Sequence, residues 1–200
     1  MPAKAHARSR NAVRRASPAA EAMPPWNVLA TSLEGRRDAL LIALRKLGKF
    51  RRGGYRNVIV GQVEDVPAFL LDVRAALAAE PLLPTALAKI VPVEMILRFD
   101  PMTAADTFAT AAEPLLDRLA GRSFFVRLER RGLKGRLHTP TLERDLGDRV
   151  WKALEARGHA PRVEFRDPDA VLVVETVGEE AGLGVVTRAL RTEYPFVKIR

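Results

Sequence analysis

Apolar positions between Trp26 and Phe99 follow two different spacings. Residues 36–48 and 66–80 carry apolar side chains at helical spacing, and Gly48 is well placed to end the first helix. Residues 26–32, 49–63 and 89–99 form short apolar runs typical of strands; Gly53-Gly54 is the turn of a hairpin, and Pro92 interrupts or starts the last run. The order strand, helix, hairpin, helix, strand predicts a ferredoxin-like βαββαβ unit over residues 26–100.

The second half of the chain predicts an α/β domain with a central sheet over residues 101–200. Residues 104–120 are helical, with Pro114 starting a second segment, and residues 122–131 form a strand. Residues 137–158 form a helix capped by Thr139 and ended by Gly158. The remainder predicts two strands across the Asp-Pro-Asp turn of 162–176, then a final strand with a short helix or extended tail. The whole chain is therefore expected to be α+β.

Positive charge is concentrated in three places along a chain of 200 residues with a net charge of +9. Residues 1–25, rich in Ala, Arg, Ser and Pro, predict a disordered basic arm, with a targeting segment as the alternative. The other two clusters lie within residues 45–56 and 122–136. Basic excess favours polyanions, nucleic acid first and anionic membrane second, although a cationic turn can also serve only solubility.

Motifs for catalysis and metal binding are missing from the sequence. There is no cysteine, no phosphate-binding loop and no HExxH, and the three histidines lack metal-ligand spacing. No apolar run reaches the roughly 18 residues of a membrane span. We therefore expect a cytoplasmic protein without metal, cofactor, membrane contact or enzymatic activity.

The stretch "RSFFVRLERRG" combines a strand pattern with clustered arginines. Alternation assigns Phe124, Val126 and Leu128 to the core, and Phe125, Arg127 and Arg131 to the opposite, outward side. Aromatic and cationic side chains on one face suit base stacking and phosphate contact. The alternative is that a neighbouring helix covers Phe125.

The segments "SFFVRLERRG", "TPTLERDLGDRV" and "VEFRDPDAVLVVETVGEEAGLGVV" together resemble the THUMP domain, and "WNVLATS…LGKF…VIVGQVED" is similar to the ferredoxin-like domain that precedes it. The family is an RNA-binding module of tRNA-modifying proteins, and the chain is more similar to its stand-alone adaptors for tRNA acetylation than to members with a catalytic domain. The resemblance implies a hairpin at "DPD…VVE". It also implies an RNA surface, which the last three residues named here extend: Arg127, Arg130, Arg131, Lys134, Arg136, Lys49, Arg51 and Arg52.

The resulting hypothesis is a non-catalytic protein that binds tRNA, or other structured RNA, near the acceptor end and presents it to a separate tRNA-modifying enzyme. A tRNA-modifying enzyme with an unrecognised active site is one alternative. A protein-interaction scaffold is the other.

Overall fold

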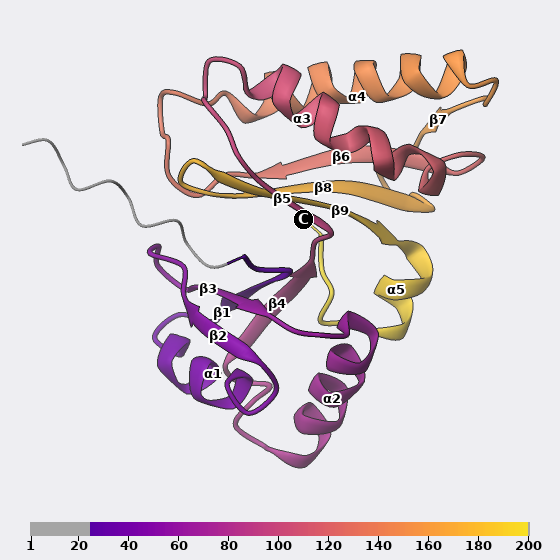
Figure 1. Ribbon diagram of the computed structural model, residues 1–200. Helices are drawn as coiled ribbons and strands as arrows, with labels where there is room; N and C mark the ends of the chain where they lie inside the picture. Colours follow the sequence, from indigo (N-terminus) through magenta and orange to yellow (C-terminus); the bar gives the residue numbers. More distant parts are fainter. Residues whose placement is uncertain (1–24, 200) are drawn as a thin grey trace, which may run out of the picture.

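The computed structural model describes residues 25–199 (Figure 1). The expected basic arm, apart from Pro25, lies outside the described residues. The first half contains, in order, β1 (Val28–Ser32), α1 (Arg37–Leu44), β2 (Lys49–Arg52), β3 (Val58–Gln62), α2 (Val66–Ala79) and β4 (Leu87–Pro92). The strands pair antiparallel in the order β2-β3-β1-β4, which we call the first sheet. This confirms the ferredoxin-like βαββαβ unit.

The predicted strand over residues 89–99 is interrupted near Pro92, as one of the two expected readings had it, but its assignment as a whole to the ferredoxin-like sheet is wrong. It divides into β4 and β5 (Met95–Arg98), and β5 pairs with β9 in a different sheet. At the crossing, Glu94 N donates to Leu183 O at 2.7 Å, and Glu94 Oε1 accepts from Val185 N at 3.0 Å. Pro92 marked a possible interruption, but the sequence could not reveal that the two parts join different sheets, because both parts are strands and only their distant partners differ.

A mixed sheet, which we call the second sheet, forms the other half in the order β5-β9-β8-β6-β7. Strand β6 is parallel to β7 and β8, while β9 is antiparallel to β8 and β5. Its elements are α3 (Ala104–Ala112), the 3₁₀ helix η1 (Glu113–Arg118), β6 (Ser123–Glu129), α4 (Thr139–Ala156), β7 (Arg162–Val163), β8 (Ala170–Val177), β9 (Glu180–Thr187) and α5 (Arg188–Glu193).

Two local predictions in this half are corrected. Helix α4 begins at Thr139 with His138 in the capping position, so Thr139 is not the cap. Pro140 lies in the first turn, where its missing N–H has no helical partner to lose. The Asp-Pro-Asp segment does not join a hairpin, since β7 and β8 flank β6 on opposite sides.

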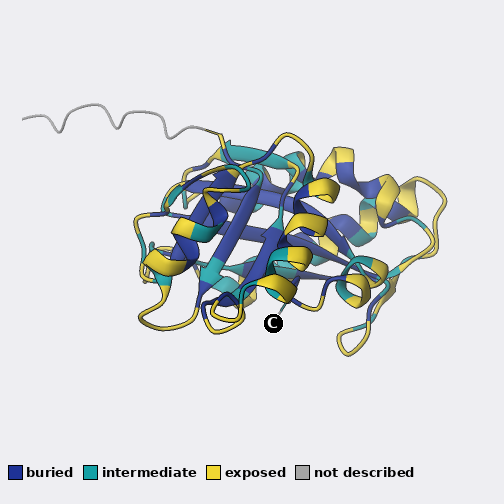
Figure 2. Ribbon diagram, turned by 90° about the horizontal axis from the view of Figure 1, so that it is seen from below, coloured by how far each residue is buried: buried dark blue, intermediate teal, exposed yellow. Residues whose placement is uncertain are grey.

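The elements stack as helices, sheet, sheet and helices (Figure 1). Every residue of β8 is buried. Ala170, Leu172 and Val174 contribute to the core beneath α3 and α4. Val171, Val173 and Val177, on the opposite face, contribute to the core of the first sheet. Figure 2 shows mostly buried strands covered by helices with exposed outer faces.

The end of the chain returns to the first sheet, where Ile90 N donates to Phe196 O at 2.9 Å. Apolar residues of both sheets pack in one cluster, in which Val171 and Val173 of β8 lie with the side chains of the first sheet. The division at residue 100 into a ferredoxin-like domain and a THUMP domain stays a prediction. Within residues 25–199, no helix is long and apolar enough to cross a bilayer.

Candidate nucleic-acid interface

Three turns that are distant in sequence meet at one edge of the molecule. They are the β2–β3 turn, the β8–β9 turn, and residues 130–138 between β6 and α4, which we call the basic loop. Tyr55 of the β2–β3 turn lies directly over Gly132: a Cβ there would overlap the Tyr55 hydroxyl and lie 2.8 Å from Cζ. A Cβ on Gly178, in the β8–β9 turn, would lie 3.2 Å from the same hydroxyl. Both basic clusters predicted from the sequence thus border one surface.

The basic loop has a defined backbone. Gly132, Leu133 and Gly135 have φ values of 87°, 53° and 80°, in the left-handed region that glycine adopts most readily. Leu137 is buried and anchors the far end of the loop. Lys134 and Arg136 between these anchors are exposed; Arg136 lies 3.3 Å from Glu179, whereas Lys134 makes no ion pair with the described residues. Arg130 is half-buried and donates to Gly132 O.

Arg131 does not face outward as predicted. Only 9% of the residue is exposed, and its guanidinium pairs with Glu129 at 2.8 Å and with Glu175. Lys89 of β4 completes the group: it contacts Glu175 at 3.2 Å and also Glu129. Burial raises the pKa of the Glu175 carboxyl, and the charges of Arg131 and Lys89 oppose that shift. The four charges, which we call the ion ring, are committed to one another rather than to a ligand.

The prediction for Phe125 is also corrected. Phe124, Val126 and Leu128 are buried on the α4 side, as expected, but Phe125 is itself only 9% exposed. It packs against the core of the first sheet, because both faces of the second sheet are covered. The exposed ring is Phe165, 75% accessible and 5.8 Å from Phe125 between ring centroids.

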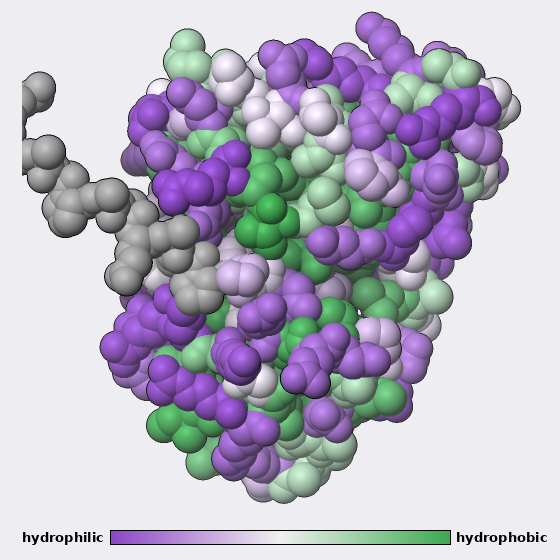
Figure 3. Space-filling view, viewed as in Figure 1, coloured by the Kyte–Doolittle hydropathy of each residue, from purple (hydrophilic) through white to green (hydrophobic). Residues whose placement is uncertain are grey.

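The predicted extension along β2 is only partly brought to this edge. Arg52 directly precedes the β2–β3 turn and pairs with Asp38 at 2.9 Å, and Arg51 is half-buried beside it. Lys49 is exposed at the opposite end of β2, where it pairs in register with Gln62. In the view of Figure 3, hydrophilic side chains lie along both borders of the face, including the uncovered part of the left border, where the three turns lie.

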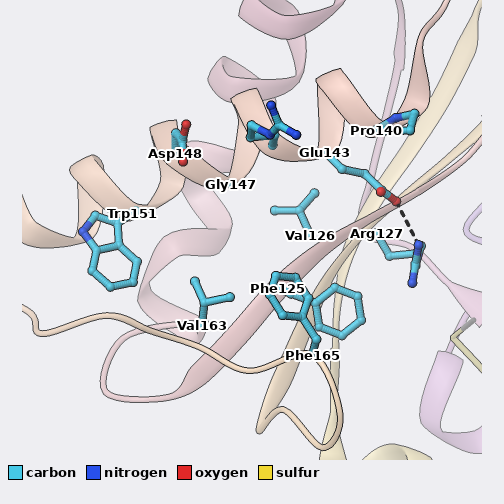
Figure 4. A pocket seen from close by; sticks show the side chains of 11 residues that line it. Phe125, Val126, Arg127, Pro140, Glu143, Gly147, Asp148, Trp151, Val163 and Phe165 are labelled. Atoms are coloured by element: carbon cyan, nitrogen blue, oxygen red, sulfur yellow. Dashed lines mark hydrogen bonds and ion pairs between the residues drawn. The ribbon is translucent and has the colours of Figure 1, made fainter.

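A pocket of about 300 Å³ lies between α4 and β6, beside the basic loop (Figure 4). Aromatic side chains form much of its wall: Phe125, Trp151 and Phe165. Arg127 borders it, lies 5.5 Å from the Phe125 ring centroid, and has a buried Nε without a hydrogen-bond partner among the described residues. Glu143 accepts from Leu128 N at 2.8 Å and pairs with Arg127 at 3.3 Å.

Sequence reasoning missed Tyr55, Trp151 and Phe165. Tyr55 stood within the basic cluster of residues 45–56, and Trp151 lay within the helix predicted over residues 137–158, so their types offered a weak signal. Nothing local indicated that Phe165 would meet β6. Among the described residues, no group of three or more His, Cys, Asp or Glu side chains is placed to hold a metal.

The fold and this edge define an α+β protein in which a ferredoxin-like sheet packs against a mixed sheet that carries a basic loop. Residues 104–186 match the THUMP domain family. No curated protein sequence matches the chain.

Solved structures share this fold. TrmN from Thermus thermophilus is 24% identical, with a TM-score of 0.56 over 79% of this chain and 44% of that one. A 4-thiouridine synthetase in complex with RNA and ATP is 16% identical, with a TM-score of 0.53 over 81% and 41%. PH1313 from Pyrococcus horikoshii is 10% identical, with a TM-score of 0.51 over 82% and 55%. The chain therefore spans between 41% and 55% of these relatives.

Proposed function

We propose that this chain is a non-catalytic RNA-binding protein that recognises tRNA near its acceptor end and presents it to a separate tRNA-modifying enzyme. The observation that carries the proposal is the contact of Tyr55 with Gly132, because it joins two basic clusters into one surface. The THUMP domain at residues 104–186 supports this reading, as does the similar fold of a synthetase solved with RNA.

The proposed phosphate contacts are the exposed or half-exposed cations around the three turns. Lys134, Arg136 and Arg130 lie in the basic loop, and Arg52 and Arg51 lie at the end of β2. Several of these cations have acidic neighbours, so phosphates would compete with exposed ion pairs that are worth little in water. Such contacts hold an RNA backbone in register without reading its sequence.

The pocket between α4 and β6 provides a complementary feature. Its aromatic side chains could stack an unpaired base, and Arg127 at its border could contact the adjoining phosphate. Arg127 is therefore retained as an RNA contact in the proposal. Arg131 is not retained, because the ion ring occupies its guanidinium.

Filter binding of tRNA across a salt series tests the proposal. Affinity should fall with rising salt, and Lys134→Glu should weaken binding by about tenfold at low salt by removing one phosphate contact. Lys152→Glu, an exposed site in the last turns of α4, is the matched control and should bind like the unmodified chain. Salt-independent binding, or equal affinity for duplex DNA, would contradict RNA recognition.

The adaptor role needs a separate test. Purified protein incubated with tRNA and common group donors should leave the nucleosides unchanged in mass spectrometry, whereas adding the partner enzyme should produce a modification. A modified nucleoside formed by this chain alone would favour the enzyme alternative. Recovery of an acidic protein partner, with no RNA bound, would favour the scaffold.

A further inference from the structure

The ion ring consists of two cations and two carboxylates that pair with one another. Lys89 contacts both Glu129 and Glu175, and so does Arg131. Each carboxylate therefore lies between both cations. Three of its side chains are less than a tenth exposed, while Glu129 is 38% exposed and reaches solvent.

Stability alone does not account for this arrangement. Removing three charged side chains from water is costly, and well-packed apolar residues of similar volume are often equally or more stabilising. A ring in which every charge is paired defines a geometry, because a buried charged group is stable only in contact with its partners.

The ring lies where the two sheets meet the basic loop. Lys89 comes from β4 of the first sheet and Glu175 from β8 of the second. Arg131 is the second residue of the basic loop, and its backbone is held too: its N–H donates to Thr176 Oγ1 at 3.1 Å, and its carbonyl accepts from Gly178 N at 2.9 Å. The next residue, Gly132, lies beneath Tyr55 of the first sheet's hairpin.

We propose that Lys89 and Glu175 are positioning residues: through Arg131 they hold the basic loop in the shape that places Arg130, Lys134 and Arg136 against RNA. This rests on the proposed function for its RNA-binding consequence. Lys89 pairs with Glu129 and Glu175, which both pair with Arg131, and so it makes the position of the basic loop depend on the ferredoxin-like sheet.

The double variant Lys89→Met/Glu175→Gln tests this inference, because it removes one cation and one anion and leaves Arg131 paired with Glu129. The matched control is Arg74→Met/Glu193→Gln, which removes an exposed ion pair between α2 and α5. Glu129→Gln changes the most exposed member of the ion ring and is a milder second variant. It should change loop exchange and tRNA affinity in the same direction as the double variant.

Two measurements decide the outcome. Amide hydrogen exchange over residues 131–137 of the free protein should accelerate by about tenfold in the test variant and not in the control. The slope of log affinity for tRNA against log salt should become shallower by about one phosphate contact. If the variant were only destabilised, a smaller fraction of the molecules would bind tRNA, but the salt dependence of the affinity of the folded molecules would be unchanged.

Unchanged exchange in the loop would overturn the inference whatever RNA does. Faster exchange with an unchanged slope would overturn its link to RNA. If the unmodified chain fails to bind tRNA, the proposed function fails, and exchange alone then decides whether Lys89 and Glu175 hold the loop.

Discussion

Arg131 and Lys134 lie three positions apart in one basic stretch but have opposite surroundings. Arg131 is buried between two carboxylates, whereas Lys134 is exposed and unpaired among the described residues. Net charge and spacing in the sequence do not distinguish the two residues, because neither property predicts which side chain is buried. Only the tertiary structure separates a cation that holds the fold from one available to a ligand.

Arg131→Met should therefore lower the free energy of unfolding by about 3 kcal/mol, since it leaves buried Glu175 with one cation instead of two. Lys134→Met should change it by less than about 0.5 kcal/mol. Urea denaturation followed by circular dichroism measures both. Equal effects at the two positions would contradict the ion ring.

Gly132 and Gly135 allow backbone strain to be separated from crowding. Both have positive φ, but only Gly132 has a neighbour, Tyr55, in the way of a Cβ. Gly135→Ala should cost about 1 kcal/mol of unfolding free energy for the strained backbone alone. Gly132→Ala should lower the free energy of unfolding, measured by urea denaturation, by more than Gly135→Ala does. Adding Tyr55→Ala to the Gly132→Ala chain should remove the difference between the two glycine variants. If the two single variants are equal, Tyr55 does not hold the loop.

At the scale of elements, the join between β6 and β8 predicts a dependence on pH. Backbone and side-chain hydrogen bonds from Ser123 lower the pKa of the Asp169 carboxyl, with Arg188 adding to the shift. A lowered folded-state pKa gives stability that is present above the ordinary aspartate value of about 3.9 and is lost as pH falls through the folded value.

Asp169→Asn should therefore be less stable than the unmodified chain at pH 7, and the difference should narrow at pH 3 in urea titrations. Asp72→Asn, on the exposed side of α2, should track the unmodified chain at both values. A difference that stays constant with pH would mean that the Asp169 charge does not stabilise the join.

Elements with local signals were predictable, and those set by distant partners were not. Helix α2 and helix α4 follow from apolar spacing with proline in the first turn, both read within a few residues. The separation of β5 from β4 depends on β9, roughly 85 residues later in the chain, and the burial of Phe125 depends on the first sheet. For the site, the basic loop was found from its charge, while the ion ring and the aromatic pocket need the pairing of residues far apart in sequence.

At the scale of the whole molecule, the shared core predicts that the second half does not fold independently. Strand β5 lies before residue 100, and Val171, Val173 and Val186 pack into the core of the first sheet. A fragment of residues 101–200 should expose this apolar face, bind a hydrophobic dye and lack a cooperative thermal transition. Residues 26–200 should unfold in one transition. A soluble, cooperatively folding fragment would show that the boundary at residue 100 separates autonomous domains.

The ion ring also responds to heat differently from the apolar core around it. The hydration of charged groups becomes less favourable as temperature rises, so the penalty for keeping Lys89, Arg131 and Glu175 out of water shrinks on warming. Hydrophobic stabilisation gains little over the same range. The contribution of the ion ring to stability should therefore increase on warming relative to that of the apolar core. The basic loop should keep its conformation until the whole protein unfolds.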